Sequence, residues 1–172
     1  MDKIVFITGA SSGIGAGCAR KFASQGASLI LNARNVNKLS ALKEELEKQY
    51  GAKIYLLPFD VRDRKAATSA LESLPKEWQS IDLLVNNAGL VIGTDKEQEG
   101  SLDEWDIVID TNIKALLAMT RLIVPGMVER KRGHIINIGS IAGDAAYPGG
   151  SVYCATKAAV KALSDGLRIE SD

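Results

Sequence analysis

The stretch Ile4-Val-Phe-Ile-Thr-Gly-Ala-Ser-Ser-Gly-Ile-Gly15 decides how this chain folds. Its first four residues are apolar, which is typical of a strand buried on both faces of a parallel sheet. The glycines come next, and an amphipathic helix is predicted where they stop. A helix start offers unpaired backbone N–H groups to an anion, and glycines let a pyrophosphate approach the backbone closely. We therefore expect a dinucleotide-binding turn made of Gly9, Ser11, Ser12, Gly13, Ile14 and Gly15.

The spacing of these glycines leaves an alternative open. It is Thr-Gly-x-x-x-Gly-Ile-Gly rather than the more common G-x-G-x-x-G, so a plain tight turn would also account for it. A nucleoside-triphosphate loop is not expected, because no Lys-Ser or Lys-Thr pair follows the last glycine. The order of the segments downstream has to decide between a binding turn and a plain turn.

Strand and helix patterns alternate through the rest of the chain. Strands are predicted at 28–33, 53–58, 81–86 and 134–140. Helices are predicted at 16–25, from a cap at Asn35 or Asn37 to about 50, and at 63–74, 106–130 and 151–172, with Ser101 capping a further short helix. Such alternation with short links predicts right-handed βαβ units, and hence an α/β protein with one doubly wound parallel sheet. Ligands of such sheets bind beyond the carboxyl ends of the strands. The residues expected at that edge are 9–15, Arg34, Asp60, Val61, 86–89 and Ser140.

Composition and charge narrow the classes of protein and of partner. At 172 residues the chain is expected to form a single domain, 1–172, with a sizeable hydrophobic core. Basic and acidic residues number 21 each, so neither a nucleic acid nor a membrane surface is an expected partner. The first strand begins too early for a signal peptide, and no apolar run reaches membrane-spanning length, which favours the cytoplasm.

The few cysteine and histidine residues predict no metal site. Cys18 and Cys154 lack the spacing of a metal-binding or redox pair, and we expect both to be small core residues in a reducing compartment. The only histidine, His134, lies in a strand pattern and is expected to be buried. A Ser-His-Asp hydrolase and a multi-histidine metal site are therefore not favoured.

Tyr153 and Lys157 lie four residues apart on the last predicted helix, so their side chains share one face. An isolated tyrosine phenol ionises only at about pH 10, but a nearby ammonium favours the phenolate form. Ser140, at the end of the preceding strand, is placed to hydrogen-bond the same substrate oxygen, and Asn112 to join a proton-carrying chain. Each also has a structural interpretation: a surface pair for Tyr153 and Lys157, a cap for Ser140, and support of a helix irregularity for Asn112.

The residues after the second predicted strand indicate which dinucleotide is bound. NAD-specific sites place a carboxylate there, which bonds the ribose hydroxyls and repels a 2′-phosphate. Here the sequence is Asn32-Ala33-Arg34-Asn35, with one arginine and no acid. A guanidinium can bind a phosphate bidentately, so NADP is favoured, with NAD as the alternative. The structural alternative is an Arg34 side chain that points to solvent.

Taken together, these motifs resemble those of the short-chain dehydrogenase/reductase family. The matching segments are Thr8-Gly9-Ala10-Ser11-Ser12-Gly13-Ile14-Gly15, Asp60-Val61, Asn86-Asn87-Ala88-Gly89, Asn112, Ser140 and Tyr153-x-x-x-Lys157. They occur over the whole chain in the family's order, which makes the resemblance highly specific. Within the family, segments 125–130, 133–140 and 147–150 resemble the NADP-dependent 3-hydroxy acid (serine-type) dehydrogenases.

The resemblance implies an oxidoreductase that moves a hydride between NADP(H) and a secondary alcohol or ketone, without a metal. The implied substrate is a short 3-hydroxy acid such as serine or 3-hydroxybutyrate. Tyr153 would be the general base in oxidation and the general acid in reduction, while Lys157 would support it and bind the nicotinamide ribose. Ser140 would orient the substrate oxygen, and Asn112 would support a proton relay through water.

The resemblance also implies a Rossmann-like sheet of strand order 3-2-1-4-5 and a division of the cofactor among its loops. The glycine turn would bind the pyrophosphate, and Asp60 and Val61 the adenine. Asn87, Ala88 and Gly89 would line the floor of the pocket. A 3-oxoacyl reductase of the same family carries the same motifs and is the alternative enzyme.

The sequence departs from the family at its C-terminal end. It stops at residue 172, inside the last predicted helix, whereas family members continue through a sixth strand, a Pro-Gly turn, a helical lid and a seventh strand. We therefore expect a domain that is incomplete at its C-terminus, either a fragment of a longer enzyme or a naturally shortened chain. A shortened chain could be a dinucleotide-binding or assembly module without turnover. A homodimer or homotetramer through helices 106–130 and 151–172 is expected.

Overall fold

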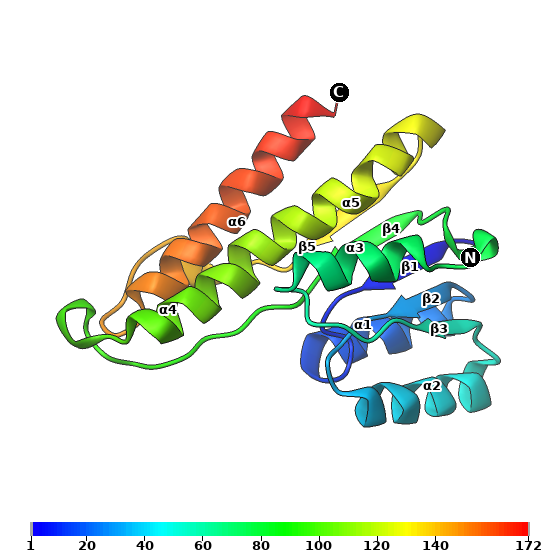
Figure 1. Cartoon of the computed structure of the whole chain (residues 1–172), viewed down its shortest axis with the longest axis horizontal. Helices are drawn as coiled ribbons and strands as arrows, with labels where there is room; N and C mark the ends of the chain where they lie inside the picture. Colours follow the sequence, from blue (N-terminus) through cyan, green and yellow to red (C-terminus); the bar gives the residue numbers. More distant parts are fainter. Residues whose placement is uncertain (1, 172) are drawn as a thin grey trace.

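The structure is a computed structural model that describes residues 2–171. Strands and helices alternate along this part of the chain (Figure 1). The strands are β1 (Ile4–Ile7), β2 (Ser28–Leu31), β3 (Ile54–Leu56), β4 (Leu83–Asn86) and β5 (His134–Asn137). The helices are α1 (Gly13–Ser24), α2 (Val36–Tyr50), α3 (Arg64–Glu72), α4 (Leu102–Ile109), α5 (Ala115–Arg130) and α6 (Ser151–Glu170). Shorter helical turns are η1 (Lys76–Trp78), η2 (Glu97–Glu99), η3 (Asp110–Lys114) and η4 (Ile141–Gly143).

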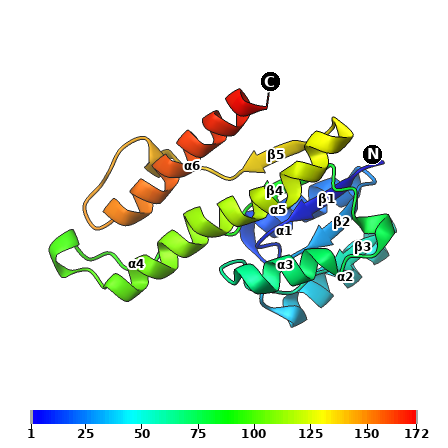
Figure 2. The same cartoon turned by 45° about the horizontal axis from the view of Figure 1, so that its top comes forward.

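The five strands form one parallel sheet in the order β3-β2-β1-β4-β5. This order confirms the predicted doubly wound, Rossmann-like fold. Figures 1 and 2 show α1 and α2 on one face of the sheet and α3 and α5 on the other. Because β1 is the middle strand, the glycine turn that follows it lies at the centre of the carboxyl edge, where the ligands of such sheets bind.

Side chains of the central strands alternate between two hydrophobic cores. Val5 and Ile7 pack in the core that α1 and α2 cover, while Phe6 packs in the core that α3 and α5 cover. All three side chains are fully buried. Burial of each such side chain stabilises the fold by about 1.5–3 kcal/mol. The apolar residues of β1 therefore tie both layers of helices to the sheet.

Several predicted boundaries were wrong by a few residues, and three of them lie next to predicted site residues. α1 begins at Gly13 rather than at 16, so the last two glycines of the turn belong to the first turn of the helix. β2 ends at Leu31 rather than at 33, although the backbone N–H of Asn32 still donates to Ile7 O at 3.0 Å. β5 ends at Asn137 rather than at 140. In each case the chain leaves its strand or enters its helix earlier than the apolar pattern indicates.

The helix predicted over 106–130 begins earlier and is not regular. Ser101 is its N-cap, as predicted for the short helix, and accepts a hydrogen bond from the Glu104 N–H at 3.3 Å. From Leu102 the chain stays helical through α4, a π-helical turn η3 and α5. The short and long helices of the prediction are thus one interrupted helix, and the interruption contains Asn112.

The prediction that His134 is buried was wrong, because this residue is exposed. It begins β5, which pairs with β4 alone, and each residue of β5 is exposed or only half-buried. Cys154 is buried as predicted and Cys18 is half-buried, and both thiols are free. Within residues 2–171, no helix is long and apolar enough to cross a membrane, and no three His, Cys, Asp or Glu side chains gather as ligands for a metal.

Candidate active site

The turn between β1 and α1 leaves backbone N–H groups open to a ligand. Ser12 is the N-cap of α1, and its side chain makes no capping hydrogen bond. Gly9 and Gly13 have φ of +60° and +55°, which other residues rarely adopt. A Cβ on Gly15 would lie 2.2 Å from the carbonyl oxygen of Gly9, so the turn closes tightly on the helix. The start of α1 can therefore bind an anion such as a pyrophosphate.

A buried threonine fastens this turn to the segment that leaves β4. Thr8 Oγ1 accepts hydrogen bonds from the backbone N–H groups of Asn87 and Ala88, at 3.0 and 2.9 Å. The Asn87 side chain returns two, from Nδ2 to Thr8 O at 3.2 Å and to Gly9 O at 2.9 Å. Six polar atoms are thus satisfied between two loops that are far apart in sequence. Asn87 was predicted to line the pocket floor, and the contacts of its side chain with the glycine turn were not predicted.

A cleft of about 820 Å³ opens along the carboxyl edge of the sheet. It brings together most of the predicted site residues, namely Gly9, Ser11, Ser12, Ile14, Arg34, Asp60, Val61, Asn87, Ala88, Gly89, Ser140, Tyr153 and Lys157. Gly13, Gly15 and Asn112 do not line it. Residues that the sequence analysis had not singled out, among them Phe59 and Arg62, line it as well. One cleft therefore joins the glycine turn to the Tyr–Lys pair.

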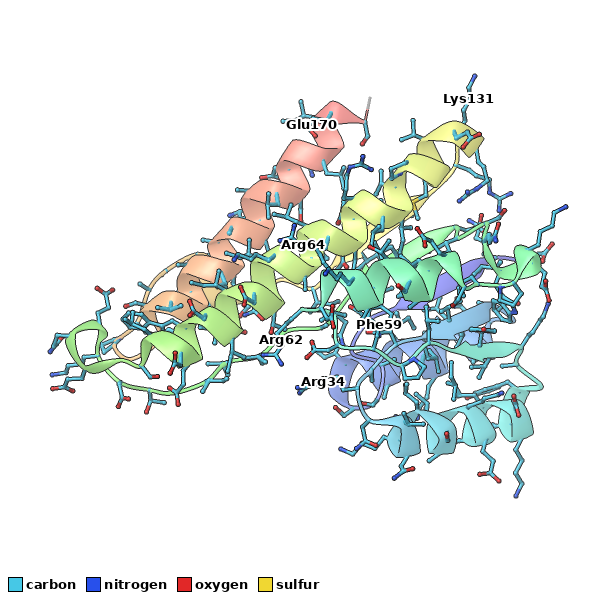
Figure 3. The ribbon with its side chains drawn as sticks, in the orientation of Figure 1. Arg34, Phe59, Arg62, Arg64, Lys131 and Glu170 are labelled. Carbon is cyan, nitrogen blue, oxygen red and sulfur yellow. The ribbon has the colours of Figure 1, made fainter. Side chains whose placement is uncertain are left out.

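Arg34 is exposed and lines the cleft just beyond β2. Figure 3 shows Arg34 and Arg62 extending from the ends of β2 and β3 toward the side on which α4 lies. The positive charge of Arg34 contributes to the lowered pKa of the Asp60 carboxyl, after the larger effect of Arg62. The side chain reaches solvent from the wall of the cleft, and its binding of a 2′-phosphate stays a prediction.

Tyr153 and Lys157 lie on the first turns of α6, at the other end of the cleft. Lys157 Nζ is 6.0 Å from the centre of the Tyr153 ring and donates to Ile138 O at 3.2 Å. Lys157 is only 8% exposed, and this burial lowers the pKa of its ammonium group. A Cβ on Gly89 would lie 3.4 Å from Nζ, so this glycine leaves room for the lysine head.

Asn112 lies in the π-helical turn, and its side chain connects two other elements. Its Oδ1 accepts from the Leu90 N–H at 2.9 Å, and its Nδ2 donates to Leu90 O at 2.9 Å. Nδ2 also donates to Thr156 Oγ1 at 3.1 Å, and Thr156 in turn donates to Tyr153 O at 2.7 Å. The amide therefore connects the loop after β4 to the first turn of α6, and its bonds lead out of the helix irregularity in which Asn112 lies.

Ser140 caps the short helical turn η4 and lines the cleft. Its Oγ accepts a hydrogen bond from the Ala142 N–H at 3.1 Å, so the capping role predicted as an alternative is present. A hydroxyl that accepts in this way keeps its own proton for another acceptor. The Ser140 hydroxyl can therefore donate to an oxygen atom of a substrate in the cleft.

A row of polar side chains ties α6 to the sheet. Asn86 Nδ2 donates to Asn137 Oδ1 at 3.0 Å, which links β4 to β5. Asn137 Nδ2 donates to Ser164 Oγ at 2.9 Å, which links β5 to α6. This row was not predicted, because it depends on the strand register that places Asn86 opposite Asn137. The row holds the helix that carries the Tyr–Lys pair.

A family model described as short chain dehydrogenase matches residues 3–172. Among curated proteins, the NADP-dependent 3-hydroxy acid dehydrogenase YdfG of Escherichia coli K12 is 48% identical over 167 residues. This match covers 97% of the present chain but 66% of the relative, so the chain spans just under two thirds of its length.

Two solved structures of serine dehydrogenases are similar to this chain over almost its whole length. The crystal structure of serine dehydrogenase from Escherichia coli is 48% identical with a TM-score of 0.92, and the match covers 97% of this chain and 76% of that one. The closed form of a serine dehydrogenase complexed with NADP+ is 47% identical with a TM-score of 0.90, with 97% of this chain and 66% of that chain covered.

Proposed function

Because the chain belongs to the short chain dehydrogenase family, we propose that it is the cofactor-binding and catalytic part of an NADP(H)-dependent oxidoreductase. It transfers a hydride between NADP(H) and a secondary alcohol or ketone, and it forms a single dinucleotide-binding domain. The observation that carries the proposal is that the glycine turn and the Tyr153–Lys157 pair line one cleft. The cofactor named for the YdfG and serine dehydrogenase relatives supports NADP over NAD.

The residues of the cleft fit a dinucleotide. The uncapped start of α1 offers N–H groups to a pyrophosphate, and Ser11 and Ser12 add hydroxyl donors. Arg34 supplies the cation for a 2′-phosphate. When bound, NADP(H) accepts or donates the hydride at its nicotinamide ring. Asp60 and Val61 follow β3 and line the part of the cleft that would bind the adenine. Asn87, Ala88 and Gly89 line the floor of the cleft.

The chain's own residues move the proton. Tyr153 takes the hydroxyl proton of the alcohol in oxidation and returns it in reduction. The Lys157 ammonium stands beside the Tyr153 ring and favours its anionic form. Ser140 donates a hydrogen bond that orients the substrate oxygen. Asn112 acts through the position of α6 and the loop at Leu90, to which its amide is bonded.

The substrate we propose is a short 3-hydroxy acid such as serine or 3-hydroxybutyrate. The names of the similar proteins support this class. A 3-oxoacyl reductase is the second candidate, favoured only by the motifs that the two activities share. A dinucleotide-binding module without turnover is the third.

We propose further that the protein is a homodimer or homotetramer in the cytoplasm. Leu117 and Val128 on α5 and Ile169 on α6 are exposed, as are several alanines of α6. A second copy of the chain would cover these helices. Free thiols at Cys18 and Cys154 fit a reducing compartment. Light scattering at micromolar concentration tests the assembly, and a monomer would contradict it.

Activity is tested directly with NADP+ and two hydroxy acids, serine and 3-hydroxybutyrate, by following NADPH formation. We expect oxidation of at least one of them. The matched assay supplies NADPH with a 3-oxoacyl thioester. Turnover of the thioester alone would favour the 3-oxoacyl reductase. Cofactor binding without turnover of any of the three would favour the binding module.

A further inference from the structure

Asp60 and Arg62 are tied together on the wall of the cleft, just beyond β3. Arg62 Nη2 donates to Asp60 Oδ2 at 2.8 Å, and Nε lies 3.2 Å from both carboxylate oxygens. The backbone N–H of Arg62 donates to Oδ1 at 3.0 Å. The family resemblance accounts for an acid at this place but says nothing of the arginine two residues later.

These hydrogen bonds leave the carboxylate little freedom. A carboxylate has roughly four acceptor positions. The backbone N–H occupies one position on Oδ1 and Nη2 one on Oδ2, and Nε, at 3.2 Å from both oxygens, occupies a third. One acceptor position of the carboxylate therefore remains. Since Asp60 lines the cleft, a bound ligand can supply the donor for it.

We propose that Arg62 is a positioning residue, which aims the remaining acceptor of Asp60 at the amino group of the cofactor's adenine. This inference rests on the proposed NADP(H) site. The exocyclic amino group of adenine is an N–H donor. Hypoxanthine has a carbonyl oxygen in the same ring position, which an ionised carboxylate repels. Arg62 thereby makes the cleft select an adenine dinucleotide over its hypoxanthine analogue.

The surrounding charges keep Asp60 an acceptor. The hydrogen bonds from Arg62 hold the pKa of the Asp60 carboxyl below its usual range, against the opposing effect of partial burial. The positive charge of Arg34 acts in the same direction. The hydrogen bond with Asp60 is the main cause that raises the pKa of the Arg62 guanidinium, and the negative charge of Asp110 in η3 adds to it, so the guanidinium stays charged. An ionised carboxylate offers no proton to a carbonyl oxygen, so the selection against hypoxanthine is retained at neutral pH.

The competing role for Arg62 is direct binding of the 2′-phosphate beside Arg34. The two roles differ in what the arginine discriminates. A positioning residue for Asp60 affects adenine against hypoxanthine and leaves NADPH against NADH unchanged. A phosphate ligand does the opposite.

The experiment measures dissociation constants of the full chain for NADPH, NADH and the hypoxanthine analogue of NADPH. The wild-type chain is expected to bind NADPH at least about 10-fold more tightly than the analogue, the ratio that about 1.4 kcal/mol gives. Arg62→Gln should lower this ratio to about 2- to 3-fold and leave the ratio of NADPH to NADH unchanged. Arg62→Lys should be intermediate, because an ammonium cannot bond both oxygens in one plane.

Two further variants complete the test. Asp60→Asn should abolish or invert the preference, because its amide N–H can donate to the hypoxanthine carbonyl. Arg64→Gln is the matched control: Arg64 begins α3, lies outside the cleft, and is seen apart from Arg34 and Arg62 in Figure 3. It loses the same charge and should change neither ratio.

The outcomes separate this inference from the proposed function. An unchanged adenine preference in Arg62→Gln would overturn it, and so would a shift confined to the ratio of NADPH to NADH. A wild-type chain that binds NADPH tightly but does not discriminate the analogue would overturn this inference alone. A folded wild-type chain that binds neither NADPH nor NADH would overturn the proposed function as well.

Discussion

The two ends of the cleft are built on different supports. Under the proposed adenosine end, β1 and β2 are almost entirely buried between two layers of helices. Under the catalytic end, β5 has no fully buried residue and α6 extends past the sheet (Figures 1 and 2). Ile141 and Ile169 in this second half are 91% and 72% exposed.

The difference lies in what holds each half in place. Hydrophobic burial fixes β1 and β2, the strands that precede the glycine turn and Arg34, and the hydrogen bonds of Thr8 and Asn87 add to this at the turn itself. Hydrogen bonds between side chains hold α6, through the row from Asn86 to Ser164 and through the amide of Asn112. Hydrogen bonds contribute about 0.5–1.5 kcal/mol each, less than a buried Leu or Ile. Cofactor binding and catalytic geometry should therefore respond differently to mutation.

The largest expected effect is a loss of turnover without a loss of cofactor binding, which would distinguish the catalytic end of the cleft from the adenosine end. Tyr153→Phe removes the hydroxyl that carries the proton and should lower kcat by about 10²- to 10⁴-fold. The dissociation constant for NADPH should change by no more than about 2-fold, since the glycine turn and Arg34 stay intact. Stopped assays of turnover measure kcat, and fluorescence titration measures the dissociation constant for NADPH. Tyr50→Phe, at the exposed end of α2, is the control. Equal losses of binding and turnover would contradict the separation.

The next largest effect is expected from overpacking of the glycine turn at the adenosine end of the cleft. Gly15→Ala would put a Cβ 2.2 Å from Gly9 O and 2.5 Å from Asn87 Nδ2, so backbone must move. Overpacking of this kind costs about 1–3 kcal/mol of unfolding free energy, and NADPH binding should weaken by at least about 10-fold. Gly17→Ala in the same helix meets nothing within 4 Å and should instead stabilise the chain by about 0.5–1 kcal/mol. Similar denaturation midpoints for the two variants would show that the turn is not closely packed.

A smaller effect is expected in the catalytic half. Asn137→Ala removes the link between β4, β5 and α6, and should cost about 1–2 kcal/mol. Hydrogen exchange should rise in α6 and remain unchanged in β1. Asn37→Ala, on the exposed side of α2, is the matched control and should leave both regions alone. Faster exchange in β1 would mean that the two halves unfold together.

The smallest effect concerns pH. The folded-state pKa of Asp60 is lowered, chiefly by Arg62, so its stabilisation is present above the unfolded pKa of about 3.9 and is lost as pH falls through the folded pKa. Arg62→Gln should therefore cost about 1 kcal/mol or less at pH 7 and progressively less toward pH 3. Urea denaturation of both chains at each pH measures the difference. A cost independent of pH would place the role of Arg62 outside the ion pair.

The sequence was sufficient where a motif is local and follows a strand. Gly9, Arg34, Asp60 and Ser140 each come just after a predicted strand, and parallel strands bring their carboxyl ends to one edge. The strand order itself followed from the resemblance.

Contacts between distant segments could not be predicted in this way. The bonds from Thr8 to Asn87 join residues about eighty positions apart, and the place of Asn137 depends on the register of β5. His134 was misassigned because its place in a strand pattern was taken to mean burial, although the expected strand order put this strand at the edge of the sheet. Arg62 was missed although it stands two residues from Asp60, a spacing that allows a local ion pair.

The central claim is that this cleft binds NADP(H) through the glycine turn and Arg34. Fluorescence titration of the 172-residue chain with NADPH and with NADH tests it most directly. We predict that NADPH binds at least about 10-fold more tightly, because a charge-assisted phosphate contact is worth about 1.5–3 kcal/mol. Equal affinity for the two would contradict the role of Arg34. A folded chain that binds neither would contradict the account of the cleft.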